Sequence, residues 1–205
     1  MEYVLYVQLW WKPSSLPMAF VVYSAILASL TGSYSSLRLL ESGIELLHSF
    51  IQLGAESSMN HWGSELLKVV CTLLLHGIDQ DEAPAGGRQR VLRQRIREIA
   101  YSCVGTLAER YPHIIRNEEI QSPDGLWIGV PEGLFQLLST EDSEAQLSVV
   151  EACSRVSYAF RDDINQSTRL SDLLLHYSLH GNVRTRQVAL EWTVRIFPFS
   201  DVRAR

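Results

Sequence analysis

The chain has 205 residues, of which 46% are hydrophobic and 20% are charged, and its formal net charge is −5. This balance is typical of a globular protein and excludes an intrinsically disordered chain, and the negative charge gives no reason to expect a nucleic acid as the main partner. The length suits one or two ordinary domains, or about four helix pairs in a helical repeat protein.

Residues 1–32 are predicted to form a buried helix or an irregular segment. The stretch 16–30 is rich in apolar residues, but Pro17 interrupts it, and it is shorter than the ~20 residues that a transmembrane helix needs. A secretory signal would begin with basic residues, whereas Glu2 comes first and Lys12 is the only early cation. A signal or membrane segment and a wrongly assigned start of the chain are the alternatives for this region.

Two amphipathic helices are predicted next, over 33–54 and 57–76, because apolar residues recur in both at intervals of three and four. Only Ala55 and Glu56 separate them, so we expect these helices to form an antiparallel pair. The stretch 77–88 contains acidic residues, a proline and a glycine pair, which predicts an exposed loop.

An arginine-rich segment follows and provides a possible basic face for a partner, made of Arg88, Arg90, Arg93 and Arg95. Such a face could bind phosphate groups or an acidic protein. The alternative is a solvated helix face, with Glu98 three residues after Arg95 as a partial ionic partner. Aromatic residues, which proteins use to stack the bases of single strands, do not alternate with these arginines.

The clearest predicted helix runs from Arg95 to Tyr111. Its apolar residues recur at intervals of three and one, which places them on one stripe of a helix: Ile96, Ile99, Ala100, Cys103, Val104 and Leu107. Pro112 is expected to end this helix, because proline lacks an N–H donor and disfavours a helical conformation of the preceding residue. A single helix cannot bury such a stripe alone, so partner helices are required.

Residues 112–130 are predicted to be a linker with a turn at 123–125, where Pro, Asp and Gly follow one another. A helix over 131–138 and a second helix with an apolar stripe over 149–160 are expected to form the next pair. We see no strand pattern of convincing length anywhere in the chain.

Two further helices are predicted over 165–180 and 183–197, joined by Gly181 and Asn182. The second of them is apolar nearly all round, so we expect other parts of the protein to cover it on two sides. Burying a Leu, Ile or Val side chain contributes ~1.5–3 kcal/mol to stability, so leaving such a stripe uncovered would cost much of the stability of the fold.

A short signature recurs at the start of three predicted helices. It consists of a small or apolar residue, an arginine, two further residues, an alanine or valine, and apolar residues down the same face. Two copies carry the arginine, and their residues are Ile96, Arg97, Ala100, Val104 and Leu107 in one and Arg186, Ala189 and Trp192 in the other. The third copy starts at Ala145 and has Gln146 in place of the arginine.

The copies begin at positions 96, 145 and 185, close to the ~40–47-residue period of HEAT and armadillo repeats. The sequence therefore predicts an all-α fold, a HEAT/armadillo-like solenoid of antiparallel helix pairs. This solenoid is expected to occupy residues 33–205 and to form part of a longer array.

No motif of nucleotide-binding proteins, serine hydrolases or zinc proteases is present, so we expect a protein that is not an enzyme and holds no cofactor or metal. His176 and His180 share a helix face at the spacing of some zinc sites, but no third ligand lies nearby. We interpret them as histidines at a helix end; a helical metalloenzyme is the alternative.

The three cysteines, Cys71, Cys103 and Cys153, lie on or beside apolar stripes and lack the close spacing of zinc ligands. Free cysteine packs as a small hydrophobic residue, so we expect them to be reduced core residues. Reduced cysteines favour the cytoplasm and the nucleus as the location of the protein.

Three segments carry more specific motifs: IREIAYSCVGTLAERYPHIIRNE, GLFQLLSTEDSEAQLSVVEACSRV and VRTRQVALEWTVRIFPFSDV. The first ends its helix in Pro112-His113, the second contains Leu134-Phe135 and Glu151-Ala152, and the third closes in Phe197-Pro198. In this order the segments resemble successive HEAT units of the proteasome adaptor and scaffold protein family. The resemblance covers about residues 33–205 and only a minor part of these very large proteins, so the chain is expected to be a fragment.

The resemblance implies a non-catalytic scaffold that binds the 26S proteasome and holds or checks the association of its core and regulatory particles. It implies proteasome subunits as partners. The charge and the apolar pattern of the sequence predict neither nucleic-acid binding nor membrane insertion, and the expected location is the cytoplasm and nucleus. A HEAT or armadillo module for another cargo, as in nuclear transport or phosphatase assembly, is the main alternative. A helical repeat that binds nucleic acid through the arginine cluster is a third hypothesis.

Overall fold

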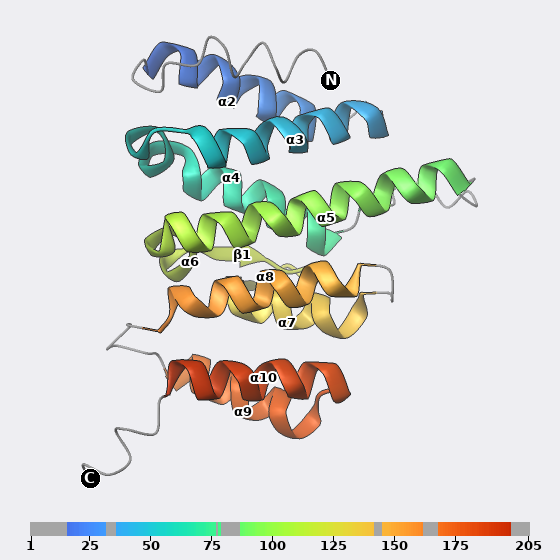
Figure 1. The fold of residues 1–205 in the computed structure, drawn as a ribbon, viewed down its shortest axis with the longest axis vertical. Coiled ribbons are helices and arrows are strands. Elements are labelled where there is room, and N and C mark those ends of the chain that lie inside the picture. The colour runs from blue at the N-terminus through green and yellow to red at the C-terminus, as the bar shows by residue number, and fades with distance from the viewer. Residues whose placement is uncertain are drawn as a thin grey trace.

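Helices stacked along one axis make up the protein in the computed structural model (Figure 1). The structure describes residues 16–31, 36–76, 78, 87–141, 145–161 and 168–197. The helices are α2 (Leu16–Thr31), α3 (Leu37–Leu53), α4 (Glu56–His76), α5 (Gly87–Arg110), α6 (Pro112–Asn117), α7 (Val130–Thr140), α8 (Gln146–Ala159), α9 (Thr168–His180) and α10 (Val183–Ile196). Two short strands, β1 (Glu119–Gln121) and β2 (Trp127–Gly129), lie between α6 and α7.

The long helices form two layers. The front layer of Figure 1 contains α3, α5, α8 and α10, and each of these helices packs against the next one along the stack. The rear layer contains α4, α7 and α9, and α2 packs against both α3 and α4 at one end. Along the chain the pairs are therefore α2 with α3, α4 with α5, α7 with α8, and α9 with α10. This all-α solenoid of helix pairs confirms the predicted fold class.

The pairing differs in one respect from the prediction for 33–54 and 57–76. The two helices follow each other closely, but α3 belongs to the front layer and packs on α2 and α5, whereas α4 belongs to the rear layer. The missing partner of α3 is α2, whose residues Ala19, Tyr23 and Ile26 are buried. Proximity in sequence therefore predicted the wrong helix pair, because the short connection after α3 leads from one pair to the next.

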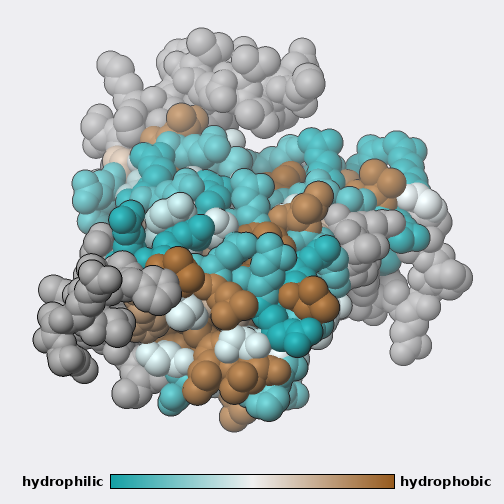
Figure 2. Space-filling model, turned by 60° about the horizontal axis from the view of Figure 1, so that its bottom comes forward, coloured by the Kyte–Doolittle hydropathy of each residue, from teal (hydrophilic) through white to brown (hydrophobic). Residues whose placement is uncertain are grey.

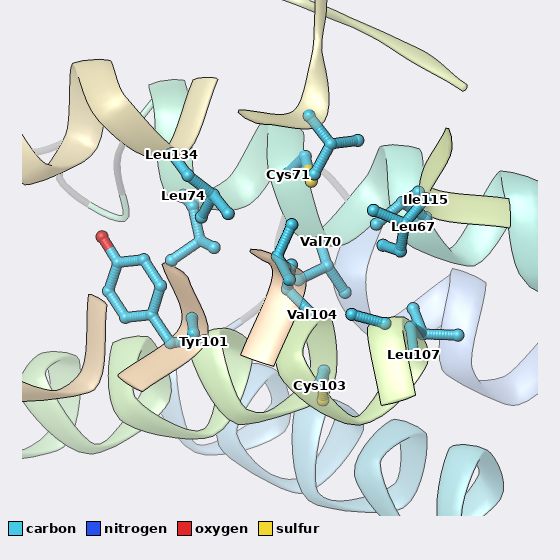
Figure 3. Packing of buried hydrophobic residues seen from close by; sticks show 14 of the residues in the cluster. Leu67, Val70, Cys71, Leu74, Tyr101, Cys103, Val104, Leu107, Ile115 and Leu134 are labelled. Carbon is cyan, nitrogen blue, oxygen red and sulfur yellow. The ribbon is translucent and has the colours of Figure 1, made fainter. Parts of the chain in front are cut away.

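The core lies between the two layers and runs through the stack. Figure 3 shows one part of it, where α4 contributes Leu67, Val70, Cys71 and Leu74, and α5 contributes Tyr101, Cys103, Val104 and Leu107. Ile115 of α6 and Leu134 of α7 complete this cluster. Helix α5 is thus covered on more than its predicted stripe, since Tyr101, Gly105 and Thr106 are buried as well.

The segment 112–130 is more ordered than the predicted linker. Helix α5 ends at Arg110, as expected from Pro112, but this proline begins the short helix α6, where its missing N–H costs nothing. The strands β1 and β2 then form an antiparallel hairpin, with Ile120 paired with Ile128. The sequence shows no strand pattern of convincing length, and strands of three residues leave too few alternations for such a pattern.

The hairpin turn lies at residues 123–125, as predicted from the sequence. Gly125 has φ of +79°, a left-handed conformation that glycine adopts without steric cost. Ser122 accepts the N–H of Leu126 on its hydroxyl oxygen at 3.2 Å and so closes the loop. The hairpin packs closely on α7, since a Cβ atom at Gly133 would lie 2.6 Å from Cδ1 of Ile120.

Most of the predicted loop 77–88 lies outside the described residues. Ile78 is buried, and α5 begins at Gly87, so the last residues of that stretch belong to the helix. No helix within the described ranges is long and apolar enough to span a membrane.

The last pair is close to the predicted one: α9 ends at His180 and α10 begins at Val183 as predicted, whereas the predicted start at residue 165 lies outside the described residues. The Asn182 side chain accepts a hydrogen bond from the N–H of Thr185 at 2.9 Å and caps α10. Trp192 of α10 is fully buried, and its ring lies 5.4 Å from that of Phe135 and 6.3 Å from that of Phe160, measured between centroids. This aromatic cluster joins the last pair to the pair before it.

Replacing this anchor should unfold the last junction. We expect Trp192→Ala to lower the free energy of unfolding by about 3–5 kcal/mol, because it leaves a large cavity in the core. The matched control is Leu190→Ala on the same helix, which removes a side chain that is 56% exposed and should change stability by less than about 0.5 kcal/mol. Urea denaturation followed by circular dichroism measures both; equal effects would contradict the placement of Trp192.

Candidate interaction surfaces

The apolar residues of the repeat signature lie in the core. All of them are fully buried: Ile96, Ala100, Val104 and Leu107 on α5, and Ala189 and Trp192 on α10. Their role is therefore to hold the two layers together, and the surfaces that can meet a partner lie elsewhere.

The polar residue of the signature contacts the repeat that follows it. Arg97 of α5 forms an ion pair with Glu141 at the C-terminal cap of α7, with 2.8 Å between Nη1 and Oε1. Gln146 occupies the same signature position on α8, and its side-chain oxygen accepts a hydrogen bond from Arg184 of α10. Arg186, the third member of this set, is exposed on α10, and its side chain has no hydrogen bond or ion pair with any described residue.

The carboxylate of Glu141 is held from two sides. Its side chain is only 6% exposed, and it also accepts a hydrogen bond from the hydroxyl group of Tyr101. Burial, followed by the hydrogen bond and the charge of Glu141, raises the pKa of Tyr101, so the hydroxyl stays protonated. A buried carboxylate needs such partners, since an uncompensated charge in the core is costly. Arg97 therefore has a structural role in joining two repeats.

A second polar contact joins the other ends of neighbouring front-layer helices. In each case an arginine of the later helix binds the C-terminal part of the earlier one. Arg110 of α5 donates to the backbone carbonyl groups of Ile51 and Gln52 at the end of α3. Arg195 of α10 donates to the carbonyl oxygen of Ser154 on α8 at 3.0 Å. Arg110 lies at the last turn of α3, where a cation also interacts favourably with the negative end of the helix dipole.

The junction between α5 and α8 has the most extensive contact of this type. Nε and Nη2 of Arg155 donate to the two carboxylate oxygens of Glu109, both at 2.7 Å, and Nη2 also donates to Thr106 at 3.0 Å. Gly105 provides the space, because a Cβ atom there would lie 2.9 Å from Cδ of Arg155. The hydrogen bonds from Arg155 lower the pKa of the Glu109 carboxyl below its ordinary value of 4.5.

The predicted basic face lies on the first turns of α5, which carry Arg88, Arg90, Arg93 and Arg95. Arg95 is 59% exposed but pairs with Glu41 and Glu45 of α3, at 3.2 and 2.6 Å. Arg90 and Arg93 also have interaction partners, whereas Arg88 is exposed and has no ion pair with a described residue. The segment is thus partly neutralised, and contact with a partner through it stays a prediction.

The histidines and cysteines of the described ranges form no larger cluster. His176 and His180 lie on the exposed side of α9 with 5.3 Å between ring centroids. In the part of the chain that the structure describes, no three His, Cys, Asp or Glu side chains converge on a possible metal position. Cys71, Cys103 and Cys153 are free and buried as predicted, and burial raises the pKa of each thiol.

A cleft of about 530 Å³ opens beside the hairpin, between α4, α6, α7 and α9. Several of the residues that line this cleft form ion pairs with each other. Lys68 of α4 pairs with Glu118 at 2.7 Å, and Arg169 of α9 bridges Glu119 and Glu132 at 3.2 and 2.9 Å. These pairs fix the hairpin against both the preceding and the following repeat.

The outer side of this hairpin is the most conspicuous exposed aromatic site within the described residues. Trp127 is 58% exposed and Leu126, beside it, is 65% exposed. Arg116 lines the same cleft, is exposed, and has no ion pair with a described residue. Tryptophan and arginine are enriched among the residues that carry most of the binding energy of protein interfaces. We call Arg116, Leu126 and Trp127 the hairpin face.

Neither the hairpin face nor Arg155 was predicted from the sequence. Trp127 could have been noticed, because a tryptophan next to a Pro-Asp-Gly turn is unusual in a linker. Arg155 gave no such signal, since its role depends on contact with Glu109, which lies 46 residues away in the sequence.

Comparison with known proteins adds an independent observation. The family described as "Proteasome component ECM29, N-terminal" matches residues 17–205. The human "Proteasome adapter and scaffold protein ECM29" is 29% identical over 112 residues, which is 54% of this chain and 6% of the human protein. The chain thus spans only a small part of the length of this relative. No solved structure matches the chain.

The pair of Arg155 and Glu109 makes a testable contribution to stability. Because the pKa of Glu109 is lowered in the folded protein, the stabilisation is fully present above pH 4.5 and is lost as the pH falls through the lower folded pKa. We expect Arg155→Met to reduce stability at neutral pH by about 1 kcal/mol, a modest value because Glu109 is half exposed. At acidic pH the difference in free energy of unfolding between Arg155→Met and the parent chain should become smaller.

Urea denaturation of both chains at neutral pH and below pH 4.5 measures this difference. The control is Arg116→Met, which removes an exposed arginine without an ion pair. Its difference from the parent chain in free energy of unfolding should not change with pH. If Arg155→Met lowers the free energy of unfolding by the same amount at both pH values, the pair of Arg155 and Glu109 does not provide this pH-dependent stabilisation.

Proposed function

Since the chain belongs to the family of proteasome component ECM29, N-terminal, we propose that it is a non-catalytic segment of an adaptor and scaffold that associates with the proteasome. The single observation that carries this proposal is the family match over residues 17–205. The name of the human relative, an adapter and scaffold protein of the proteasome, supports the same reading.

The geometry of the described residues is consistent with a scaffold. Its most extensive polar contacts, those of Arg97 and Arg155, join one repeat to the next. A stack in which each unit contacts only its neighbours exposes long surfaces that can meet partners at several places. Such a surface requires no reacting group, and its specificity comes from the shape and chemistry of exposed side chains.

The finer proposal is that the whole protein holds or checks the association of the core and regulatory particles of the 26S proteasome. A solenoid suits this task, because it can contact two large particles at separate points along one rigid body. A location in the cytoplasm and nucleus is part of the proposal, and the buried, free cysteines are compatible with reducing compartments.

We assign the contact of this segment with the proteasome to the hairpin face. Interface residues that dominate binding are enriched in tryptophan and arginine, and the hairpin face exposes one of each. The ion pairs of Arg169 hold the hairpin in place before binding, so little conformational entropy is lost on association.

A helical repeat module for another cargo, such as a transport factor or a phosphatase, is the alternative. The fold alone favours neither function, because solenoids of this type bind many kinds of protein. The two are distinguished by the identity of what the protein captures.

We expect the tagged full-length protein to capture core and regulatory subunits of the proteasome from its own cells. The double variant Leu126→Ser and Trp127→Ala should capture several-fold less, because it removes the apolar centre of the hairpin face. Leu147→Ser on α8 removes an exposed apolar side chain, 79% exposed, outside both the hairpin face and the arginine-rich segment of α5, and is the control. Quantitative mass spectrometry of the captured proteins provides the measurement.

The outcomes separate the parts of the proposal. Capture of transport or phosphatase subunits without the proteasome would exclude the proteasome function. Equal capture by the hairpin variant and the control would leave that function in place and exclude the hairpin face as its contact.

A further inference from the structure

The carboxylates that line the cleft beside the hairpin already have cationic partners. Lys68 pairs with Glu118 at 2.7 Å. Arg169 lies between Glu119 and Glu132 and pairs with both. The hydrogen bond from Lys68 lowers the pKa of the Glu118 carboxyl below its ordinary value, so this group is charged at neutral pH. A cationic group of a binding partner would therefore have to compete with an existing ion pair for each of these acceptors.

Among the described residues that line the cleft, Arg116 is the cation without an ion pair. It lies in the last turn of α6 and is exposed. A guanidinium group presents five N–H donors in a planar fork, which fits a carboxylate through two parallel hydrogen bonds. The open polar groups of the cleft therefore favour a carboxylate on the partner.

The same cleft has an apolar part. Trp127 lines it and is 58% exposed, while Phe160, Leu170 and Leu173 line it with little or only partial exposure. Its volume of about 530 Å³ lies within the range of ~300–1,000 Å³ that is typical of pockets for small ligands. This space suits one or two large side chains of a partner and is too small for a folded domain.

The cleft carries no excess charge, because Lys68, Arg116 and Arg169 balance the three carboxylates of its lining. Long-range attraction of a strongly acidic segment requires an excess of positive charge, which is absent here. The cleft is thus suited to a single carboxylate at a defined position, next to an apolar side chain, and not to a run of acidic residues.

We propose that the cleft and the hairpin face bind a segment of a proteasome subunit in which one Asp or Glu lies beside a large apolar residue. The carboxylate accepts two hydrogen bonds from the guanidinium group of Arg116, and the apolar side chain packs against Trp127 inside the cleft. The inference rests on the proposed function, since the partner that it describes is a subunit of the proteasome.

An acidic side chain fits this site better than the carboxylate at the end of a chain. Capture of a chain terminus uses clustered backbone N–H groups. The start of α7 lines the cleft, but Pro131 has no N–H there, and Glu132 places its own carboxylate in the first turn. A second carboxylate is therefore repelled from α7, and Arg116 is the group that receives it.

Selection of random peptides displayed on phage, with the 205-residue chain as bait, tests this chemistry directly. We expect the selected peptides to carry Asp or Glu close to Leu, Phe or Trp. Synthetic copies should bind Arg116→Glu about tenfold more weakly than the parent chain, because a charge-assisted pair is lost. Replacing the acidic residue of the peptide by its amide should cause a similar loss, measured by fluorescence anisotropy.

The matched control is Arg186→Glu on α10, which reverses another exposed arginine that has no ion pair with a described residue. Apolar side chains gather at that end of the stack as well, as Figure 2 shows with this end turned toward the viewer, and Leu190 and Val194 are 56% and 59% exposed. Arg186→Glu should bind the peptides as tightly as the parent chain. Selection without acidic residues, no selection at all, or equal binding by the two variants would overturn the proposal.

Capture from cells separates this inference from the proposed function. In the full-length protein, Arg116→Glu should capture several-fold less proteasome than Arg38→Glu, which reverses an exposed arginine of α3 that has no ion pair with a described residue. Equal capture by these two variants would overturn the inference and leave the proposed function in place. A parent protein that selects the acidic peptides but captures no proteasome would overturn both the proposed function and the partner named here.

Discussion

The structure depends on one constraint: each helix carries more apolar surface than a single partner can cover. A helix pair buries the surface between its own two members, and the remaining stripe is buried only when the next pair stacks on it. Helix α5 illustrates this, because α3, α4 and α8 surround it and leave Ala100, Val104 and Leu107 fully buried. Stacking is therefore a condition for folding and the source of the elongated shape.

Polar contacts give the stack its register. Apolar seams between helices tolerate sliding, because hydrophobic contact is not directional. The bidentate pair of Arg155 with Glu109 and the buried pair of Arg97 with Glu141 tolerate it far less, since both require defined geometry. The signature arginine of the repeat is thus explained by its position: it reaches out of its own helix pair toward the turn of the next one.

The all-α solenoid, the main helices and most of the signature core could be read from the sequence, because periodic apolar residues report directly on helical faces. The pairing of helices could not, since the short link after α3 leads into the other layer. The hairpin escaped detection because its strands are three residues long. The hairpin face and Arg155 depend on contacts between distant segments, such as Arg169 with Glu119 and Glu132, and local patterns do not record these contacts.

The central claim is that neighbouring repeats stabilise each other through these junctions, so that order is greatest in the middle of the stack. Native-state hydrogen exchange of the 205-residue chain, resolved by peptide, tests this most directly. The account predicts the slowest exchange in α5 and α8, which neighbours cover on both sides, and faster exchange in α2 and α10 at the ends. Exchange in α5 as fast as in α10 would contradict it, because the helices would then be stable independently of their neighbours.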